Sequence, residues 1–290
     1  MNDFLWHYTS LETLEKIFLE QEPRFRATHF RDFCDDNELR WAGNILLKLM
    51  TGSEDWNNAY QKEFLNALLS EKRFIEGFYI ISFCKHKDHY CQWKNYAPEG
   101  CAIGFQAQGI EHLFEHIVSF GSAGGRGYLP EQGHSLPCVY VNDEDKVKKI
   151  LTNKLKLSKQ IPKNFEQFSK FADLLLEILR IKKSNFFFEE EERLVFRYET
   201  DLRFEKYNVL NPWPYLHPNN YLYCPLNLEK LQQHPIEIML SPFADVLKGE
   251  SIVKRINKEY NLNIAISQGT SRQGNCANCI QPDNCKKSLA

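Results

Sequence analysis

One late segment, residues 186–196, joins an apolar run directly to a row of charges. It reads Phe-Phe-Phe-Glu-Glu-Glu-Glu-Arg-Leu-Val-Phe. The apolar residues favour a strand, in which side chains alternate between the two faces of a sheet. We therefore expect Glu189, Glu191 and Arg193 on one face. Two carboxylates this close repel each other, so the fold must place water, a cation or polar groups of a substrate between them.

Hydrophobic periodicity along the rest of the chain predicts both strands and helices. Strands are expected at 4–8, 78–84, 101–105, 138–141, 236–240 and 262–267, and helices at 36–51, 54–70, 143–157, 164–182 and 246–260. Residues 121–137 predict a long loop and 211–225 an irregular segment. The fold class is therefore α+β, with a mainly antiparallel sheet core and helical insertions. We predict one domain over residues 1–267, followed by a tail, 268–290, without an apolar pattern.

The N-terminal strand runs straight into a helix start. Thr9 as N-cap, with Glu12 three residues later, fits a capping box. This pattern places His7 and Tyr8 at a strand-to-helix junction, where side chains commonly face a cleft. The alternative for His7 is a structural histidine held by hydrogen bonds.

Composition excludes some classes of protein. The chain has 290 residues, and 43% of them are hydrophobic. Its formal net charge is -2, so no overall field draws the protein to DNA or to an anionic membrane. A local charged patch is still compatible with this value. The first residues do not combine a basic region with an apolar run, and no stretch approaches about eighteen apolar residues, so we expect a cytoplasmic protein without membrane partners. The nine cysteines, an odd number, predict reduced thiols rather than a disulfide framework.

Three cysteines near the C-terminus have metal-ligand spacing. Cys276 and Cys279 form a Cys-x2-Cys half-site for zinc, and Cys285 follows. A tetrahedral site needs a fourth ligand, for which Cys224, His234 and His217 are the candidates. An iron–sulfur cluster and an unstructured thiol tail are the alternatives.

Other polar and aromatic groups have two interpretations each. Asp35 or Asp36 either caps a helix or, with Glu38, lines a polar wall. Trp93 and Tyr96 either stack on a base or nicotinamide ring or pack in the core. The group of His86, Asp88, His89 and Cys91 matches no standard zinc pattern well, and a solvated loop is the simpler interpretation.

The order of these motifs resembles the bacterial domain of unknown function 2971 family, from about Phe4 to about Ile266. The resemblance is carried by residues 7–10 (His-Tyr-Thr-Ser), 34–40 (Cys-Asp-Asp-Asn-Glu-Leu-Arg), 82–83 (Ser-Phe), 93–96 (Trp-Lys-Asn-Tyr), 100–105 (Gly-Cys-Ala-Ile-Gly-Phe) and the late spacing of Lys182, Phe186, Glu189, Glu191 and Arg193. The chain departs from the pattern at Cys34, where the family usually has Asn, and at Glu192, where Trp is common. This resemblance identifies kin and not a reaction.

A second resemblance implies a reaction. A His-Tyr-Thr strand that opens into a capped helix, a middle strand with Ser and a late Glu-x-Glu strand are similar to the layout of ADP-ribosyltransferase-like folds, which split the nicotinamide–ribose bond of NAD. That resemblance implies that Glu191 stabilises the ribose cation and binds its hydroxyls, while Glu189 orients the acceptor nucleophile. It implies that His7, Tyr8, Ser82 and Arg193 bind the NAD molecule. The chain departs from this layout in three ways: no Gly-rich phosphate loop is evident, the first strand has no Arg, and the second has no Ser-Thr-Ser triplet.

The function expected from this resemblance is an ADP-ribosyltransferase-like or NAD-cleaving enzyme, with a role as a bacterial toxin or anti-phage defence effector. Its acceptor is a protein, a nucleic acid or a small molecule. The alternative is a non-enzymatic nucleotide-sensing or protein-interaction module, whose aromatic cleft binds a nucleotide or a partner without turning it over. Arg193 can also pair with Glu191, which would make a structural salt bridge in place of a catalytic acid. A metal-dependent nuclease that uses Asp35, Glu38, Glu189 and Glu191 is the third possibility.

Overall fold

The computed structural model describes residues 4–30, 36–51, 77–114, 131–158, 176–198, 216–217 and 221–271. These residues group into two compact units. Unit 1 takes its described residues from 1–30, 75–135 and 188–280, and unit 2 from 31–74 and 136–187. Unit 2 is thus built from two stretches that interrupt the sequence of unit 1. The domain boundary predicted at residue 267 stays a prediction.

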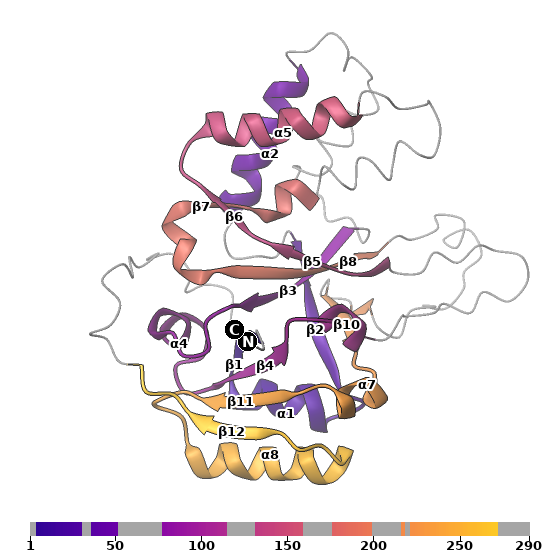
Figure 1. The fold of residues 1–290 in the computed structure, drawn as a ribbon, viewed down its shortest axis with the longest axis vertical. Helices are drawn as coiled ribbons and strands as arrows, with labels where there is room; N and C mark the ends of the chain where they lie inside the picture. The colour runs from indigo at the N-terminus through magenta and orange to yellow at the C-terminus, as the bar shows by residue number, and fades with distance from the viewer. Residues whose placement is uncertain are drawn as a thin grey trace, which may run out of the picture. The chain divides into compact units, whose positions relative to one another are not determined.

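Unit 1 is organised around a mainly antiparallel sheet (Figure 1). Its strands are β1 (Phe4–Thr9), β2 (Arg24–His29), β3 (Gly77–Cys84), β4 (Cys101–Gln106), β5 (Glu131–Pro137), β8 (Glu191–Tyr198), β9 (Leu216–His217), β10 (Tyr221–Pro225), β11 (Ile236–Leu240) and β12 (Ala265–Gln268). The order is β12-β11-β4-β1-β3-β2-β10-β9, and β8 pairs with β3 and β5. Among the strand pairs of this sheet whose direction is established in the described residues, β11 and β12 are parallel and the others are antiparallel. The predicted α+β class is confirmed.

Helices complete both units. Those of unit 1 are α1 (Leu11–Leu19), α4 (Tyr90–Tyr96), α7 (Leu228–Gln233), α8 (Val246–Tyr260) and the 3-10 helix η3 (Ile110–Leu113). Unit 2 contains α2 (Asp36–Thr51), β6 (Val139–Val141), α5 (Glu144–Ser158) and β7 (Ile181–Lys183), and β6 pairs with β7 in parallel. The 3-10 helix η4 (Ser184–Glu189) leads from β7 into β8.

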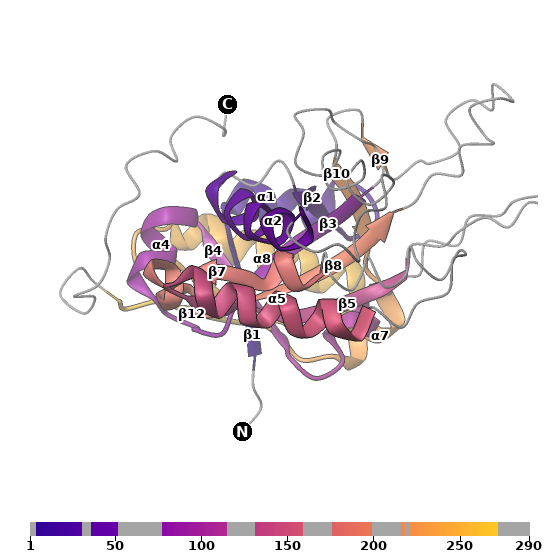
Figure 2. The ribbon, with the colours of Figure 1, turned by 90° about the horizontal axis from the view of Figure 1, so that it is seen from above.

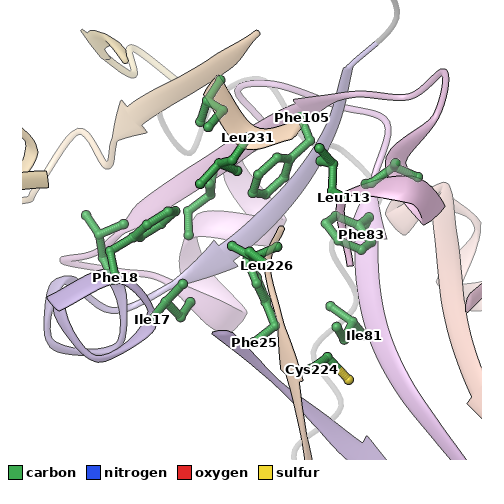
Figure 3. Packing of buried hydrophobic residues seen from close by; sticks show 14 of the residues in the cluster. Ile17, Phe18, Phe25, Ile81, Phe83, Phe105, Leu113, Cys224, Leu226 and Leu231 are labelled. Atoms are coloured by element: carbon green, nitrogen blue, oxygen red, sulfur yellow. The ribbon is translucent and has the colours of Figure 1, made fainter. Parts of the chain in front are cut away.

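One face of the unit 1 sheet packs against α1 and α8. Leu14 and Phe18 of α1 recur at a helical spacing and belong to the main hydrophobic cluster, together with Ile256 of α8. Phe25 and Phe83 join this cluster from β2 and β3, as Figure 3 shows. Burial of such large apolar side chains is the main contribution to the stability of the unit.

The opposite face of the sheet packs against α4. Trp6 and Tyr8 of β1 contact Trp93 of α4 in a second buried cluster, which also contains Cys84 of β3. Successive side chains along each strand therefore point alternately into one buried cluster and into the other. The helix α4 lies at the end of unit 1 opposite to β9 and β10 (Figures 1 and 2).

Most strongly periodic segments form the elements that the sequence predicts. The expected helices at 36–51, 143–157 and 246–260 are α2, α5 and α8, and the expected strands at 78–84, 101–105 and 236–240 are β3, β4 and β11. Three predictions were wrong: β5 begins inside the predicted loop, β10 lies in the segment predicted as irregular, and residues 181–183 form a strand instead of a helix end. Cross-strand partners decide such short strands more than local propensity does. The helix predicted at 54–70 lies outside the described residues.

The helix α1 is capped by Ser10, not by Thr9 as predicted. Ser10 Oγ accepts a hydrogen bond from Thr13 N at 3.0 Å, whereas Thr9 is the last residue of β1 and pairs with Cys101. Strand pairing extends one residue further than the sequence pattern indicates, and this extension moves the cap. Glu12 binds Lys16 one turn later, at 2.6 Å, instead of completing a capping box.

We expect Ser10→Ala to lower the free energy of unfolding by about 1 kcal/mol, because the Thr13 amide loses its acceptor. Thr9→Val is the matched control, since it removes a neighbouring hydroxyl without touching the cap. Urea denaturation of both variants measures the difference. A neutral Ser10→Ala beside a destabilised Thr9→Val would contradict the assignment of the cap.

Candidate functional site

The acidic segment divides between a 3-10 helix and a strand. Residues up to Glu189 belong to η4 and β8 begins at Glu191, so the predicted strand is shorter than expected. Glu190 between them has a φ of 37°, in the left-handed region, and its carbonyl accepts a hydrogen bond from Lys85 N at 3.3 Å. Because the chain turns at Glu190, the side chains of Glu189 and Glu191 do not follow one regular strand face. The prediction that they share such a face was wrong.

Glu191 is the centre of a buried hydrogen-bond network with Ser82 and Arg193. Ser82 Oγ donates to Glu191 Oε1 at 2.6 Å. Arg193 Nε donates to the same oxygen at 2.9 Å, and an Arg193 terminal nitrogen donates to Oε2 at 3.2 Å. The side chains of Glu191 and Arg193 are 8% and 4% exposed. The internal salt bridge that the sequence left open is therefore formed.

Strand pairing places these three residues together. β3 and β8 are antiparallel, with Ser82 opposite Arg193 and Cys84 opposite Glu191. All four side chains therefore lie on the sheet face that α4 covers. Removing a carboxylate from water is costly unless charged partners and hydrogen bonds compensate. Here a two-point guanidinium contact and a hydroxyl provide that compensation for Glu191.

Glu189 is held separately, by α4. Tyr96 donates its hydroxyl to Glu189 Oε1 at 2.9 Å. The carboxylate is buried while the Tyr96 side chain is 53% exposed, so this pair connects the interior to the surface. Trp93, by contrast, is buried in the core with its ring centroid 4.6 Å from that of Tyr8. The predicted stacking pair is therefore split, and only Tyr96 is at the surface.

Tyr8 holds a loop. The single hydrogen of its hydroxyl is shared between His86 O, at 2.8 Å, and Lys87 O, at 3.0 Å, and the hydroxyl oxygen accepts a hydrogen bond from His89 N at 3.4 Å. Burial raises the pKa of the Tyr8 hydroxyl well above its usual value. The role of Tyr8 in the structure is to fix residues 86–89 beside β1.

His7 lies on the other face of the sheet from the Glu191 carboxylate. Its ring centroid is 5.2 Å from that of Phe25 and 5.9 Å from that of Phe83, both members of the main hydrophobic cluster. His7 Nδ1 lies 3.0 Å from Ser82 O, and since a carbonyl only accepts, Nδ1 carries the proton. Burial lowers the pKa of His7. The expectation that His7 and Glu191 bind NAD from one site is therefore corrected.

The loop of residues 85–89 contains a stack of rings. His86 and His89 stack with centroids 5.2 Å apart, and His89 stacks on Phe188 at 6.2 Å. His86 Nε2 lies 3.3 Å from Glu190 Oε1. Burial, and secondarily the neighbouring His86, lower the pKa of His89.

Asp88 fastens this loop to the chain after β12. It accepts hydrogen bonds from Trp93 Nε1 at 2.6 Å, Thr270 N at 2.8 Å and Ser271 N at 3.1 Å. Burial acts to raise the pKa of Asp88, but these hydrogen bonds hold it below its usual value. The carboxylate of Asp88 therefore has a structural role as the acceptor of these hydrogen bonds.

Within the described ranges, no three His, Cys, Asp or Glu side chains are arranged to hold a metal ion. Cys276, Cys279 and Cys285 lie outside the described residues, as does Asp35. Of the proposed fourth ligands, Cys224 is a buried free thiol and His234 Nε2 lies 3.0 Å from Gln106 O. Cys224 is therefore part of the buried sheet, and the His234 ring is hydrogen-bonded to the main chain of β4.

The described cysteines do not supply an obvious nucleophile. Cys84, Cys101, Cys138 and Cys224 are not disulfide-bonded, whereas Cys91 is in a disulfide, which departs from the expectation of reduced thiols. Burial raises the pKa of the Cys84 thiol to about 12, so it stays protonated at neutral pH. The position of Cys84 two residues after Ser82 places both side chains on the same strand face.

Among the described helices, none is long and apolar enough to cross a membrane. Comparisons with protein-family models, curated proteins and solved structures gave no match to this chain.

Proposed function

We propose that the protein is an NAD-cleaving, ADP-ribosyltransferase-like enzyme of the domain of unknown function 2971 family, with Glu191 as its central carboxylate. The hydrogen bond between Ser82 and Glu191 carries this proposal. It joins two residues 109 positions apart that the resemblance assigned to one site. Their contact is what such a site requires, since a catalytic carboxylate must be held in a fixed orientation.

The reaction breaks the bond between the nicotinamide nitrogen and ribose C1′. The bonding electron pair leaves with nicotinamide, which becomes neutral, and C1′ becomes an oxocarbenium-like cation. Glu191 stabilises that cation, and the hydroxyl of water or of an acceptor then bonds to C1′ and loses its proton. Glu189 is the proposed proton acceptor, because Tyr96 connects this carboxylate to the surface. NAD is thus the substrate, and the acceptor is a protein, a nucleic acid or a small molecule.

Other predicted residues take revised roles in this proposal. His7 is a positioning residue, which fixes the main chain of Ser82 from the opposite face of the sheet. Arg193 holds Glu191 in place. Such an activity suits a toxin or anti-phage effector that acts in the cytoplasm by depleting NAD or modifying a target.

A second candidate is a module that binds a nucleotide without turning it over. The observation that favours it is the two-point contact of Arg193 with both oxygens of Glu191. A carboxylate engaged in this way is well suited to fixing the structure. Binding of NAD without release of nicotinamide would favour this candidate.

We expect Ser82→Ala to lower nicotinamide release about tenfold or more, because Glu191 loses the hydroxyl that orients it while the salt bridge with Arg193 remains. Ser135→Ala is the matched control, since Ser135 donates to the neighbouring Glu192. Chromatography of nicotinamide released by the purified proteins measures the rates. Equal losses in both variants would contradict the special role of the Ser82–Glu191 contact, and no release by the wild type would remove the enzymatic proposal.

A further inference from the structure

A polar surface of unit 1, separate from the Glu191 network, lies on β2 and β10. Four side chains form it: Arg24, Arg26, Tyr221 and Tyr223. They alternate along the two strands with Phe25, Ala27, Leu222 and Cys224, which belong to the main hydrophobic cluster. Because neighbours on a strand point to opposite faces, the four polar side chains lie on the face away from that cluster. We call them the Arg–Tyr surface.

The four side chains contact one another in a row. The guanidinium carbon of Arg24 lies 3.9 Å from the Tyr223 ring centroid, and that of Arg26 lies 5.0 Å from the Tyr221 ring centroid. The two tyrosine rings meet edge to face, with centroids 5.2 Å apart. The register places Tyr223 opposite Arg26 and Tyr221 opposite Thr28, so each cation–π contact joins diagonal neighbours across the strands.

The charge of the two arginines is not neutralised within the part of the chain that the structure describes. Their contacts there are with tyrosine rings, and neither forms an ion pair with a described carboxylate. A cation–π contact orients a guanidinium without cancelling its charge. Arg26 is exposed, and the other three side chains are partly exposed. Positive charge and planar groups therefore occupy adjacent positions on one accessible strand face.

We propose that the Arg–Tyr surface binds single-stranded nucleic acid. Guanidinium groups bind phosphate oxygens through paired hydrogen bonds, and unpaired bases stack on tyrosine rings and on guanidinium planes. An acidic peptide would satisfy the charges but not the rings, and a duplex would keep its bases from stacking on them. The net charge of -2 means that this local surface, and not the overall field, provides the attraction. The inference stands independently of the proposed NAD chemistry.

Fluorescence anisotropy of the full chain with a labelled oligothymidylate tests the proposal. The double variant Arg24→Gln/Arg26→Gln should bind more weakly, and the slope of log affinity against log salt should become shallower by about 1.4, because each single-strand phosphate contact contributes about 0.7. Tyr221→Leu/Tyr223→Leu should weaken binding about tenfold with the slope unchanged. Arg255→Gln is the control, since Arg255 is an exposed arginine already paired with Glu15. Arg24→Lys/Arg26→Lys should retain the wild-type slope.

Several results would overturn the proposal. One is no oligothymidylate binding by the wild type at about 150 mM salt. Another is equal affinity of the wild type and a folded Arg24→Gln/Arg26→Gln variant, with folding checked by thermal melts. Duplex DNA bound as tightly as the single strand would exclude stacking on the tyrosines. Binding of phosphatidylserine vesicles or oligoglutamate in place of oligothymidylate would assign the surface to a different partner.

Discussion

Glu191→Gln is expected to lower nicotinamide release from NAD by about a hundredfold or more. The physical reason is the loss of one negative charge beside the ribose cation, and removal of a single such electrostatic contact typically has an effect of this size. Glutamine keeps the shape of the side chain and can still accept the hydrogen bond from Ser82. The rate is measured by chromatography of released nicotinamide under single-turnover conditions.

Glu190→Gln provides the matched control for this variant. Glu190 is the adjacent residue, but its side chain is about half exposed, and its carboxylate is near His86 and not in the buried network. We expect this variant to retain the wild-type rate. A Glu191→Gln protein that is folded and cleaves NAD at the wild-type rate would exclude Glu191 as the catalytic carboxylate.

Arg193→Ala is expected to lower the free energy of unfolding by about 3–5 kcal/mol. It leaves the buried carboxylate of Glu191 without its guanidinium partner, and breaking a buried ion pair from one side is strongly destabilising. Lys16→Ala is the control, because Lys16 forms an exposed pair with Glu12, and solvent screens such pairs so that they contribute little to stability. Urea denaturation of both variants gives the comparison. Similar losses for the two variants would show that the Arg193 pair has no special role in stability.

A double variant separates stability from catalysis at the same position. Glu191→Leu/Arg193→Met replaces the ion pair by apolar side chains, a change that is often neutral or stabilising in a buried site. We expect most of the stability lost in Arg193→Ala to return while NAD cleavage stays absent. Recovery of both stability and cleavage would mean that the network is structural only, and the module that binds without turnover would then be the better proposal.

The extent to which the sequence predicts the candidate site differs from residue to residue. Glu191 and Arg193 were placed on one strand face, and the structure has them there, because a period of two along a strand depends on the local chain alone. Glu189 was placed on that face too, but the left-handed turn at Glu190 separates it from the strand. Such a backbone conformation is uncommon for a residue other than glycine, and the sequence of four consecutive glutamates does not indicate it.

His7 illustrates a different limit. The sequence correctly places it near the end of a strand, beside a capped helix. The alternation of side chains along a strand does not indicate which face of the strand packs against which helix. In the structure, His7 lies on the face that also contains Phe25 and Phe83. The arginines of β2 show the same limit, since their alternation with Phe25 and Ala27 is visible in the sequence but their tyrosine partners come from β10.

By itself, the sequence determined the mixed α+β class, the strongly periodic elements such as α8 and β4, and the alternation of side chains along each strand. These properties depend on neighbours a few residues apart. Only the tertiary structure decided that β3 lies beside β8, with Ser82 against Glu191, and that His7 faces the opposite side. Pairing of strands more than a hundred residues apart depends on the packing of the whole sheet. The local hydrophobic pattern determines which side chains of a strand are buried, but it does not identify the partner strand.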